Sequence, residues 1–271
     1  MKQRVITALL ITPIAVALIL LLPQLGFAML VGALCLMALW EWTRLSGLHD
    51  RRIRAGLLAL TLALFVVLWL YRATAAFWLT IVVGCAWWFV VLAWLNRFTF
   101  AASPTHENTA IKLVAGGVAV IPAWAAIVWL NGGPVYGPWW SLFALALSWS
   151  ADTFAYLAGS RWGRRKLAPN ISPGKTFAGV YGAFAGTAVV AVICGWLLGV
   201  TPMKLPLFVL LALVCVGFSI IGDLFESLIK RHAGVKDSGA MFPGHGGVFD
   251  RLDSAFAVLP IFAVGKALLG L

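Results

Sequence analysis

Residues 205–226 read LPLFVLLALVCVGFSIIGDLFE. This run is as long as a helix that crosses a bilayer, which takes roughly 20 residues. Its final turn carries two acids, Asp223 and Glu226. An ionisable group at membrane depth costs free energy, so such a residue is a functional candidate. The stretch therefore predicts a membrane-spanning helix with polar groups at one end.

The rest of the chain has the same character. It has 271 residues, of which 62% are hydrophobic and only 11% are charged, and its mean hydropathy is +0.98. Soluble domains are about half apolar and a quarter charged, so an ordinary cytosolic enzyme, a disordered chain and a disulfide scaffold are excluded. The four cysteines stand alone in apolar runs, which gives no sign of a disulfide or a zinc site.

Apolar runs, separated at charges and at Gly/Pro clusters, predict about nine transmembrane helices. We expect an all-α, polytopic helical bundle with spans at 5–22, 27–40, 56–71, 75–95, 113–130, 139–158, 177–199, 205–226 and 250–270. The chain divides into N-terminal spans (1–140) and a C-terminal catalytic region (141–271), which carries loops 159–176 and 228–249. Gly182 and Gly186 form a GxxxG pair and predict close helix packing.

Basic residues orient the bundle. With the N-terminus in the cytoplasm, only Arg72, Lys204 and Lys266 of the 20 Lys and Arg residues fall outside. Such a bias is typical of cytoplasmic loops. It accounts for the net charge of +11 without a nucleic-acid partner, and it favours a bacterial inner membrane.

Six of the nine acids gather on the predicted cytoplasmic side: Asp152, Asp223, Glu226, Asp237, Asp250 and Asp253. Asp223, Ser227 and Lys230 share one helical face. The loop that joins the last two spans is short and rich in glycine, so it holds the ends of these two spans close together. Carboxylates from both ends can share Mg²⁺, which prefers oxygen ligands, while Lys230, Arg231 and Lys236 can bind phosphates. This set of groups is typical of phosphoryl or nucleotidyl transfer.

A second basic loop contains Gly174-Lys175-Thr176, the ending of a P-loop. A P-loop needs a glycine at position 169, where this sequence has Pro169. We also expect no strand before Gly174, so we reject the P-loop interpretation. We expect Lys175 to bind a lipid or nucleotide phosphate; the alternative is a topology charge that contacts anionic lipid.

The loop between the last two spans carries a long pattern. It reads Ser227-x-Ile229-Lys230-Arg231-x4-Lys236-Asp237-x-Gly239-x2-Phe242-Pro243-x-His245-Gly246-Gly247-Val248-x-Asp250-Arg251-Leu252-Asp253. This pattern resembles the signature of phosphatidate cytidylyltransferases, also called CDP-diacylglycerol synthases. Asp152-Thr153-x-Ala155-Tyr156 and Ser172-Pro173-x-Lys175-Thr176 also look like this family. The clear resemblance covers roughly residues 150–254.

The resemblance implies the reaction CTP + phosphatidate → CDP-diacylglycerol + diphosphate in the membrane, with Mg²⁺, and an associated monovalent cation such as K⁺. It also implies a homodimer. By motif position, Asp223 and Asp250 would bind the metal.

Further roles are hypotheses. Asp237 and Asp253 would orient the basic groups or contact cytidine. His245 would donate a hydrogen bond to diphosphate or within the loop, or be a structural histidine, or act as an acid. The expected catalytic residues are Asp223, Asp250, Lys230, Lys236 and His245; the expected substrate-binding residues are Ser227, Arg231, Asp237, Gly246, Gly247, Arg251, Asp253, Asp152, Ser172, Lys175 and Thr176.

Four other functions are alternatives. CDP-alcohol phosphotransferases carry a DGxxAR…GxxxDxxxD pattern, which this sequence lacks. A sister enzyme acting on another lipid phosphate would share this motif. A transporter needs polar groups across the whole bilayer, whereas these acids cluster on one side. A non-catalytic scaffold would not explain the carboxylate cluster beside a Gly/Lys/Arg loop. Binding of CTP with Mg²⁺ separates an enzyme from the last two.

Overall fold

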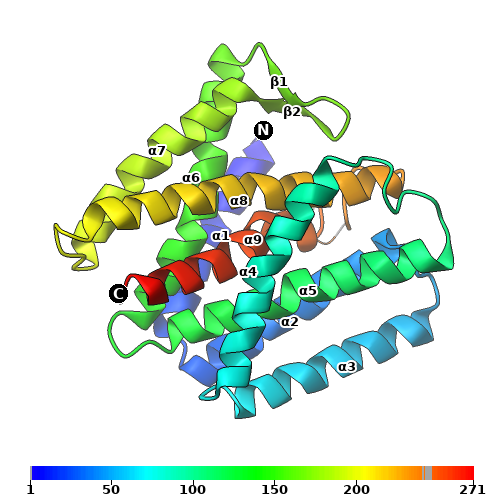
Figure 1. Cartoon of the computed structure of the whole chain (residues 1–271), viewed down its shortest axis with the longest axis horizontal. Helices are drawn as coiled ribbons and strands as arrows, with labels where there is room; N and C mark the ends of the chain where they lie inside the picture. The colour runs from blue at the N-terminus through cyan, green and yellow to red at the C-terminus, as the bar shows by residue number, and fades with distance from the viewer. Residues whose placement is uncertain (1, 240, 242–245) are drawn as a thin grey trace.

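The computed structural model describes residues 2–239, 241 and 246–271, with side chains from residue 12 onward. His245 lies outside the described residues, as do Phe242 and Pro243 of the signature. Within the described part there are nine helices and one two-stranded hairpin (Figure 1). The helices are α1 (Lys2–Leu21), α2 (Gln24–Leu45), α3 (Arg51–Leu70), α4 (Ala75–Leu95), α5 (His106–Asn131), α6 (Gly137–Trp162), α7 (Phe177–Leu197), α8 (Leu205–His232) and α9 (Phe249–Leu268).

Each predicted span coincides with one helix, with boundaries that differ by up to seven residues. Six helices, namely α2, α3, α4, α5, α7 and α8, are long and apolar enough to cross a membrane by length and composition alone. The chain is therefore a polytopic helical protein. Nine crossings and a cytoplasmic N-terminus stay predictions.

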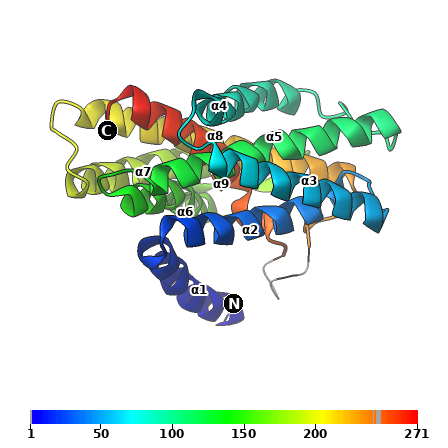
Figure 2. The ribbon, with the colours of Figure 1, turned by 90° about the horizontal axis from the view of Figure 1, so that it is seen from below.

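Helix α9 occupies the centre of the bundle, against α8, α5, α4, α6 and α2. Its residues 254–263 are all buried. Two tryptophans hold its first half: Trp42 of α2 stacks on Phe249, with ring centroids 4.7 Å apart, and the Trp88 indole of α4 donates a hydrogen bond of 3.1 Å to the Phe256 carbonyl. The start of α9 is thus anchored to helices from the N-terminal half. In contrast, α1 projects from the edge of the bundle (Figure 2).

Helices α6 and α7 pack closely through small residues. A Cβ at Gly182 would lie 2.7 Å from the carbonyl oxygen of Phe154, and a Cβ at Gly186 would overlap the Phe154 ring. Only glycine fits at these points, because the two helices leave no room for a side chain. The GxxxG prediction is confirmed.

The predicted loop 159–176 is partly ordered. Helix α6 continues to Trp162, and β1 (Lys166–Ala168) pairs antiparallel with β2 (Ser172–Thr176). The expectation that no strand precedes Lys175 was wrong, since Gly174-Lys175-Thr176 is itself the end of β2. Strand β2 pairs with β1 in a short two-stranded hairpin. The turn of this hairpin has Pro169 where a P-loop has glycine, so the P-loop interpretation stays rejected.

The strand leads directly into α7. The Thr176 hydroxyl accepts a hydrogen bond of 3.1 Å from Gly179 N and caps the helix. The second predicted loop, 228–249, also begins later than expected, because α8 continues to His232. Residues 228–232 are therefore held on a rigid helix.

Candidate active site

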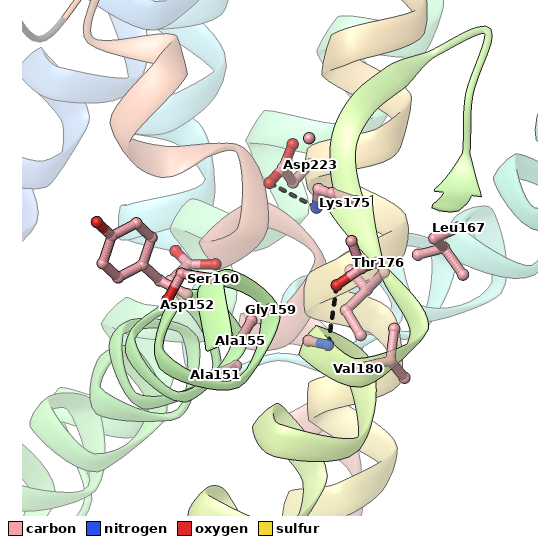
Figure 3. Close-up of a pocket in the computed structure, with 14 residues that line it drawn as sticks. Ala151, Asp152, Ala155, Gly159, Ser160, Leu167, Lys175, Thr176, Val180 and Asp223 are labelled. Atoms are coloured by element: carbon pink, nitrogen blue, oxygen red, sulfur yellow. Dashed lines mark hydrogen bonds and ion pairs between the residues drawn. The ribbon is translucent and has the colours of Figure 1, made fainter. Parts of the chain in front are cut away.

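A cavity of about 330 Å³ lies between α6, the hairpin, α7 and α8 (Figure 3). Its polar lining comes from three of these elements: Asp152 and Ser160 from α6, Lys175 and Thr176 from β2, and Asp223 from α8. The Lys175 ammonium lies 2.6 Å from Asp223 Oδ2. The structure thus brings four predicted site residues from distant parts of the chain into one pocket.

Helix α8 shapes this pocket further. The Ser227 hydroxyl, one turn beyond Asp223, donates a hydrogen bond of 3.3 Å to Asp223 Oδ1. Arg231 Nε donates one of 3.1 Å to the Ile171 carbonyl in the hairpin turn. Arg231 therefore ties the hairpin to α8, whereas sequence reasoning expected it to bind phosphate. This bond uses only Nε, so phosphate binding by the other guanidinium nitrogens stays a prediction.

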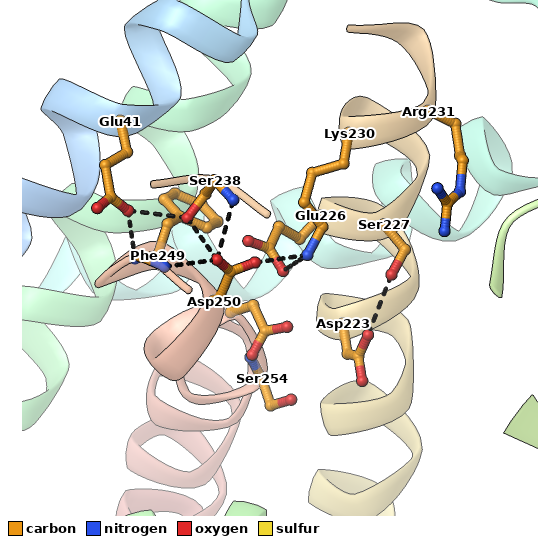
Figure 4. Close-up of polar contacts among 12 residues, drawn as sticks. Glu41, Asp223, Glu226, Ser227, Lys230, Arg231, Ser238, Phe249, Asp250 and Ser254 are labelled. Carbon is orange, nitrogen blue, oxygen red and sulfur yellow. Dashed lines mark hydrogen bonds and ion pairs between the residues drawn. The ribbon is translucent and has the colours of Figure 1, made fainter. Parts of the chain in front are cut away.

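A second polar cluster surrounds Lys230 (Figure 4). The ammonium donates to Glu226 Oε2 at 2.9 Å and to Asp250 Oδ1 at 2.6 Å. The other Asp250 oxygen, Oδ2, accepts from the backbone amides of Ser238 at 2.9 Å and Gly247 at 2.7 Å. Asp250 is consequently held in one orientation by groups from α8 and from both ends of the loop.

Glu41 of α2 completes this cluster and was missed by sequence reasoning. Its carboxylate accepts hydrogen bonds from Val248 N at 3.0 Å and Phe249 N at 2.9 Å, so it caps the N-terminus of α9. Its Oε2 also lies 2.8 Å from the Ser238 hydroxyl, which is 2.9 Å from Asp250 Oδ2. One hydroxyl proton is thus shared between two carboxylates. The only signal in the sequence was an acid at the end of an apolar run.

Glycines in the signature let Glu41 approach. A Cβ on Gly239 or Gly247 would collide with the Glu41 carboxylate, and a Cβ on Gly246 would lie 2.5 Å from Asp250 Oδ2. Gly246 also has a φ of +80°, which L-residues rarely adopt. The absence of side chains at these glycines therefore lets the loop pack closely against the carboxylates of Glu41 and Asp250.

The two clusters adjoin through Asp253, which lies beside Glu226 and within electrostatic range of Asp223 and Asp152. Arg251 is likewise within electrostatic range of Asp152. The side-chain oxygen Glu226 Oε1 is buried and has no hydrogen-bond partner among the described groups. In this region Lys175 and Lys230 pair with three of the carboxylates, Asp223, Glu226 and Asp250.

The described residues contain no group of three or more His, Cys, Asp or Glu side chains that could hold a metal ion. The two predicted metal ligands instead pair with separate lysines, Asp223 with Lys175 and Asp250 with Lys230. Of the other predicted residues, Lys236 and Asp237 are exposed on the loop, and Ser172 is half-buried on β2.

Comparisons with known proteins identify relatives over nearly the whole chain. The model of the cytidylyltransferase family matches residues 2–268. The chain is 38% identical over 264 residues to a phosphatidate cytidylyltransferase of Pseudomonas aeruginosa, covering 97% of this chain and 96% of the relative. It is 33% identical to that of Haemophilus influenzae, with 97% of both chains covered. It is 32% identical to that of Bacillus subtilis, with 96% and 95% covered.

Proposed function

The chain belongs to the cytidylyltransferase family, and from this premise we propose that it is a membrane-embedded phosphatidate cytidylyltransferase. It transfers the cytidylyl group of CTP to phosphatidate and releases diphosphate, which yields CDP-diacylglycerol for phospholipid synthesis. The observation that carries this proposal is identity of 32% to 38% over nearly full length to three relatives of that name.

The reaction is an in-line displacement. An oxygen of the phosphatidate phosphate attacks the α-phosphorus of CTP, and the bond from that phosphorus to the oxygen bridging the α- and β-phosphates breaks, so diphosphate leaves. The attacking group is already an anion, so little general-base catalysis is needed. The residues must instead position two anionic substrates and stabilise the developing charge.

Lys175 and Lys230 fit this role. Lys175 forms an ion pair with Asp223, and Lys230 forms ion pairs with Glu226 and Asp250. Lys175 also lines the pocket, where its neighbours Leu167, Val180 and Ile220 are apolar. This mixture suits a lipid phosphate at the Lys175 end and acyl chains along the apolar wall.

The gathering of carboxylates at the facing ends of α8 and α9 supports Mg²⁺ as cofactor. Asp223 and Asp250 would hold it, together with oxygens of the substrate phosphates, and a monovalent cation such as K⁺ would bind nearby. Bound Mg²⁺ would supply neutralisation of phosphate charge. On substrate binding, Lys175 and Lys230 would exchange part of their contact with these carboxylates for contact with phosphates.

Glu41 acts here as a positioning residue. It caps α9 and contacts Ser238, so it holds both ends of the loop around Asp250. Thus α2, outside the region that carries the family signature, would contribute to catalysis by fixing the loop.

The wider setting follows from the same proposal. The protein is a multi-pass protein of the bacterial inner membrane, with its site facing cytoplasmic CTP, and it functions as a homodimer without a nucleic-acid partner.

Turnover with purified protein tests this function. The protein in detergent is incubated with Mg²⁺, α-labelled CTP and dioleoyl phosphatidate, and lipid-extractable label and free diphosphate are measured. We expect equal amounts of both products, and almost none with Asp250→Asn. An ether-linked phosphatidate serves as a second acceptor. Label only with that acceptor would identify the sister activity, and binding of neither substrate by folded protein would refute both.

A further inference from the structure

A second cavity lies far along the chain from the catalytic signature. It has a volume of about 230 Å³ and lies between α2, α3 and α5. Leu39, Trp42 and Thr43 of α2 form its buried floor. Its walls are almost wholly apolar and come from the other two helices: Leu57, Leu58, Leu60 and Thr61 on α3, and Leu113, Val114 and Gly117 on α5. We call it the α3 groove.

One end of the α3 groove is strongly basic. Arg54 precedes its first wall residue by one turn and is only 7% exposed. Its guanidinium donates to the Thr43 hydroxyl at 2.9 Å and to the Trp40 carbonyl at 2.7 Å, and it stacks 3.7 Å above the Trp40 ring. Because Thr43 also lines the groove, the charge is fixed at the groove itself.

This charge has no acidic counterpart in the described structure. Arg44 and Arg51 lie within electrostatic range and repel it. The adjacent acid, Asp50, is engaged in capping α3, since it accepts from Arg52 N at 2.7 Å and Ile53 N at 3.2 Å. None of the ion pairs between described residues includes these arginines.

We propose that the α3 groove binds one anionic phospholipid of the surrounding bilayer, which is distinct from the substrate. Its phosphate would contact Arg54, Arg51 and Arg44, and one acyl chain would lie between α3 and α5. The charge complementarity selects this occupant, because basic clusters beside transmembrane helices attract anionic headgroups. Helix α3 lies at the edge of the bundle, beside α2 and α5, where bilayer lipids can reach it (Figure 1).

Such a lipid would stabilise α3. The outward side of this helix is largely exposed, including Leu62 and Val66. A bound lipid would therefore link α3 to α2 and α5 where side chains alone leave a gap.

Native mass spectrometry of the detergent-solubilised full chain tests the proposal with dioleoyl phosphatidylglycerol. We expect one retained lipid on the wild type, and no comparable retention of dioleoyl phosphatidylcholine. Gly117→Leu fills the groove, because a Cβ there meets only the end of Ile121, at 3.9 Å. Gly56→Leu is the matched control on α3, where a Cβ meets nothing within 4 Å.

Gly117→Leu should weaken retention at least about fourfold, since each displaced CH₂ contributes about 0.8 kcal/mol. The exposed Arg51→Gln should weaken it about fivefold, as for one juxtamembrane cation. Gly56→Leu should retain the lipid, and turnover should be unaffected by Arg51→Gln when phosphatidylglycerol is in excess. Equal retention by Gly117→Leu and Gly56→Leu, or equal binding of phosphatidylcholine, would overturn the proposal. Retention of phosphatidate alone would also overturn it.

Discussion

Glu41→Gln should slow the proposed cytidylyl transfer without unfolding the protein. The carboxylate is half-buried and accepts from Ser238 Oγ, Val248 N and Phe249 N at 2.8 to 3.0 Å. Glutamine keeps one acceptor oxygen and turns an NH₂ group toward a remaining donor. Charged hydrogen bonds contribute about 1.5–3 kcal/mol each, so we expect a loss of about 2 kcal/mol in holding the loop.

Expressed entirely in the transition state, this loss slows turnover about thirtyfold, because about 1.4 kcal/mol is a factor of ten. Glu41→Ala removes all three contacts and should cost at least about a hundredfold. The effect should appear mainly in kcat, since the loop orients Asp250. Glu107→Gln, an exposed acid in the first turn of α5, is the matched control and should leave kcat unchanged.

Hydrogen exchange distinguishes positioning from general destabilisation. In Glu41→Gln, the amides of Val248 and Phe249 should exchange faster, while the core amides of α9 remain protected and the melting temperature changes little. Wild-type kcat in Glu41→Ala, or unchanged exchange at these two amides, would refute the reasoning.

Three further predictions concern the site and the bundle. Asp250→Asn removes the 2.6 Å ion pair with Lys230 and should fold normally, by circular dichroism and gel filtration, yet lose at least about a hundredfold in kcat; retained turnover would argue against its role. Chelation by EDTA should abolish turnover and added Mg²⁺ should restore it, whereas full activity in EDTA would exclude the proposed cofactor. Gly186→Leu drives a side chain into the Phe154 ring and should cost about 1–3 kcal/mol, seen as a lower melting temperature than Gly56→Leu, whose position is open.

The positions of the helices could be read from the sequence because lipid imposes a local rule. A backbone in hydrocarbon must satisfy its hydrogen bonds within one segment, so an apolar run of sufficient length is a helix. The prediction for α4 matched both ends, and that for α7 matched the first residue. Helix ends outside the apolar runs follow no such rule. For that reason α6 and α8 extend beyond their predicted limits, and the hairpin at 166–176 was not expected.

The candidate site divides in the same way. The acids, lysines and glycines between residues 223 and 253 were identified from a contiguous pattern, because the signature lies in one loop and the helix ends beside it. Their partners were not. Lys175 and Asp223 are 48 positions apart yet form an ion pair. Whether a carboxylate has a lysine or a metal ion as its neighbour depends on distances in space, which the spacing of residues along the sequence does not give.

The sequence alone determined that this is a membrane-embedded helical protein and which family it resembles, and it predicts which end of the bundle carries the chemistry, since composition and local patterns are enough for each. Only the tertiary structure decided that Glu41, 207 residues before Val248, holds the start of α9, and that Arg54 lies at an apolar groove. Both depend on which helix faces pack together, and the many apolar faces of this chain are too alike for sequence to assign their partners.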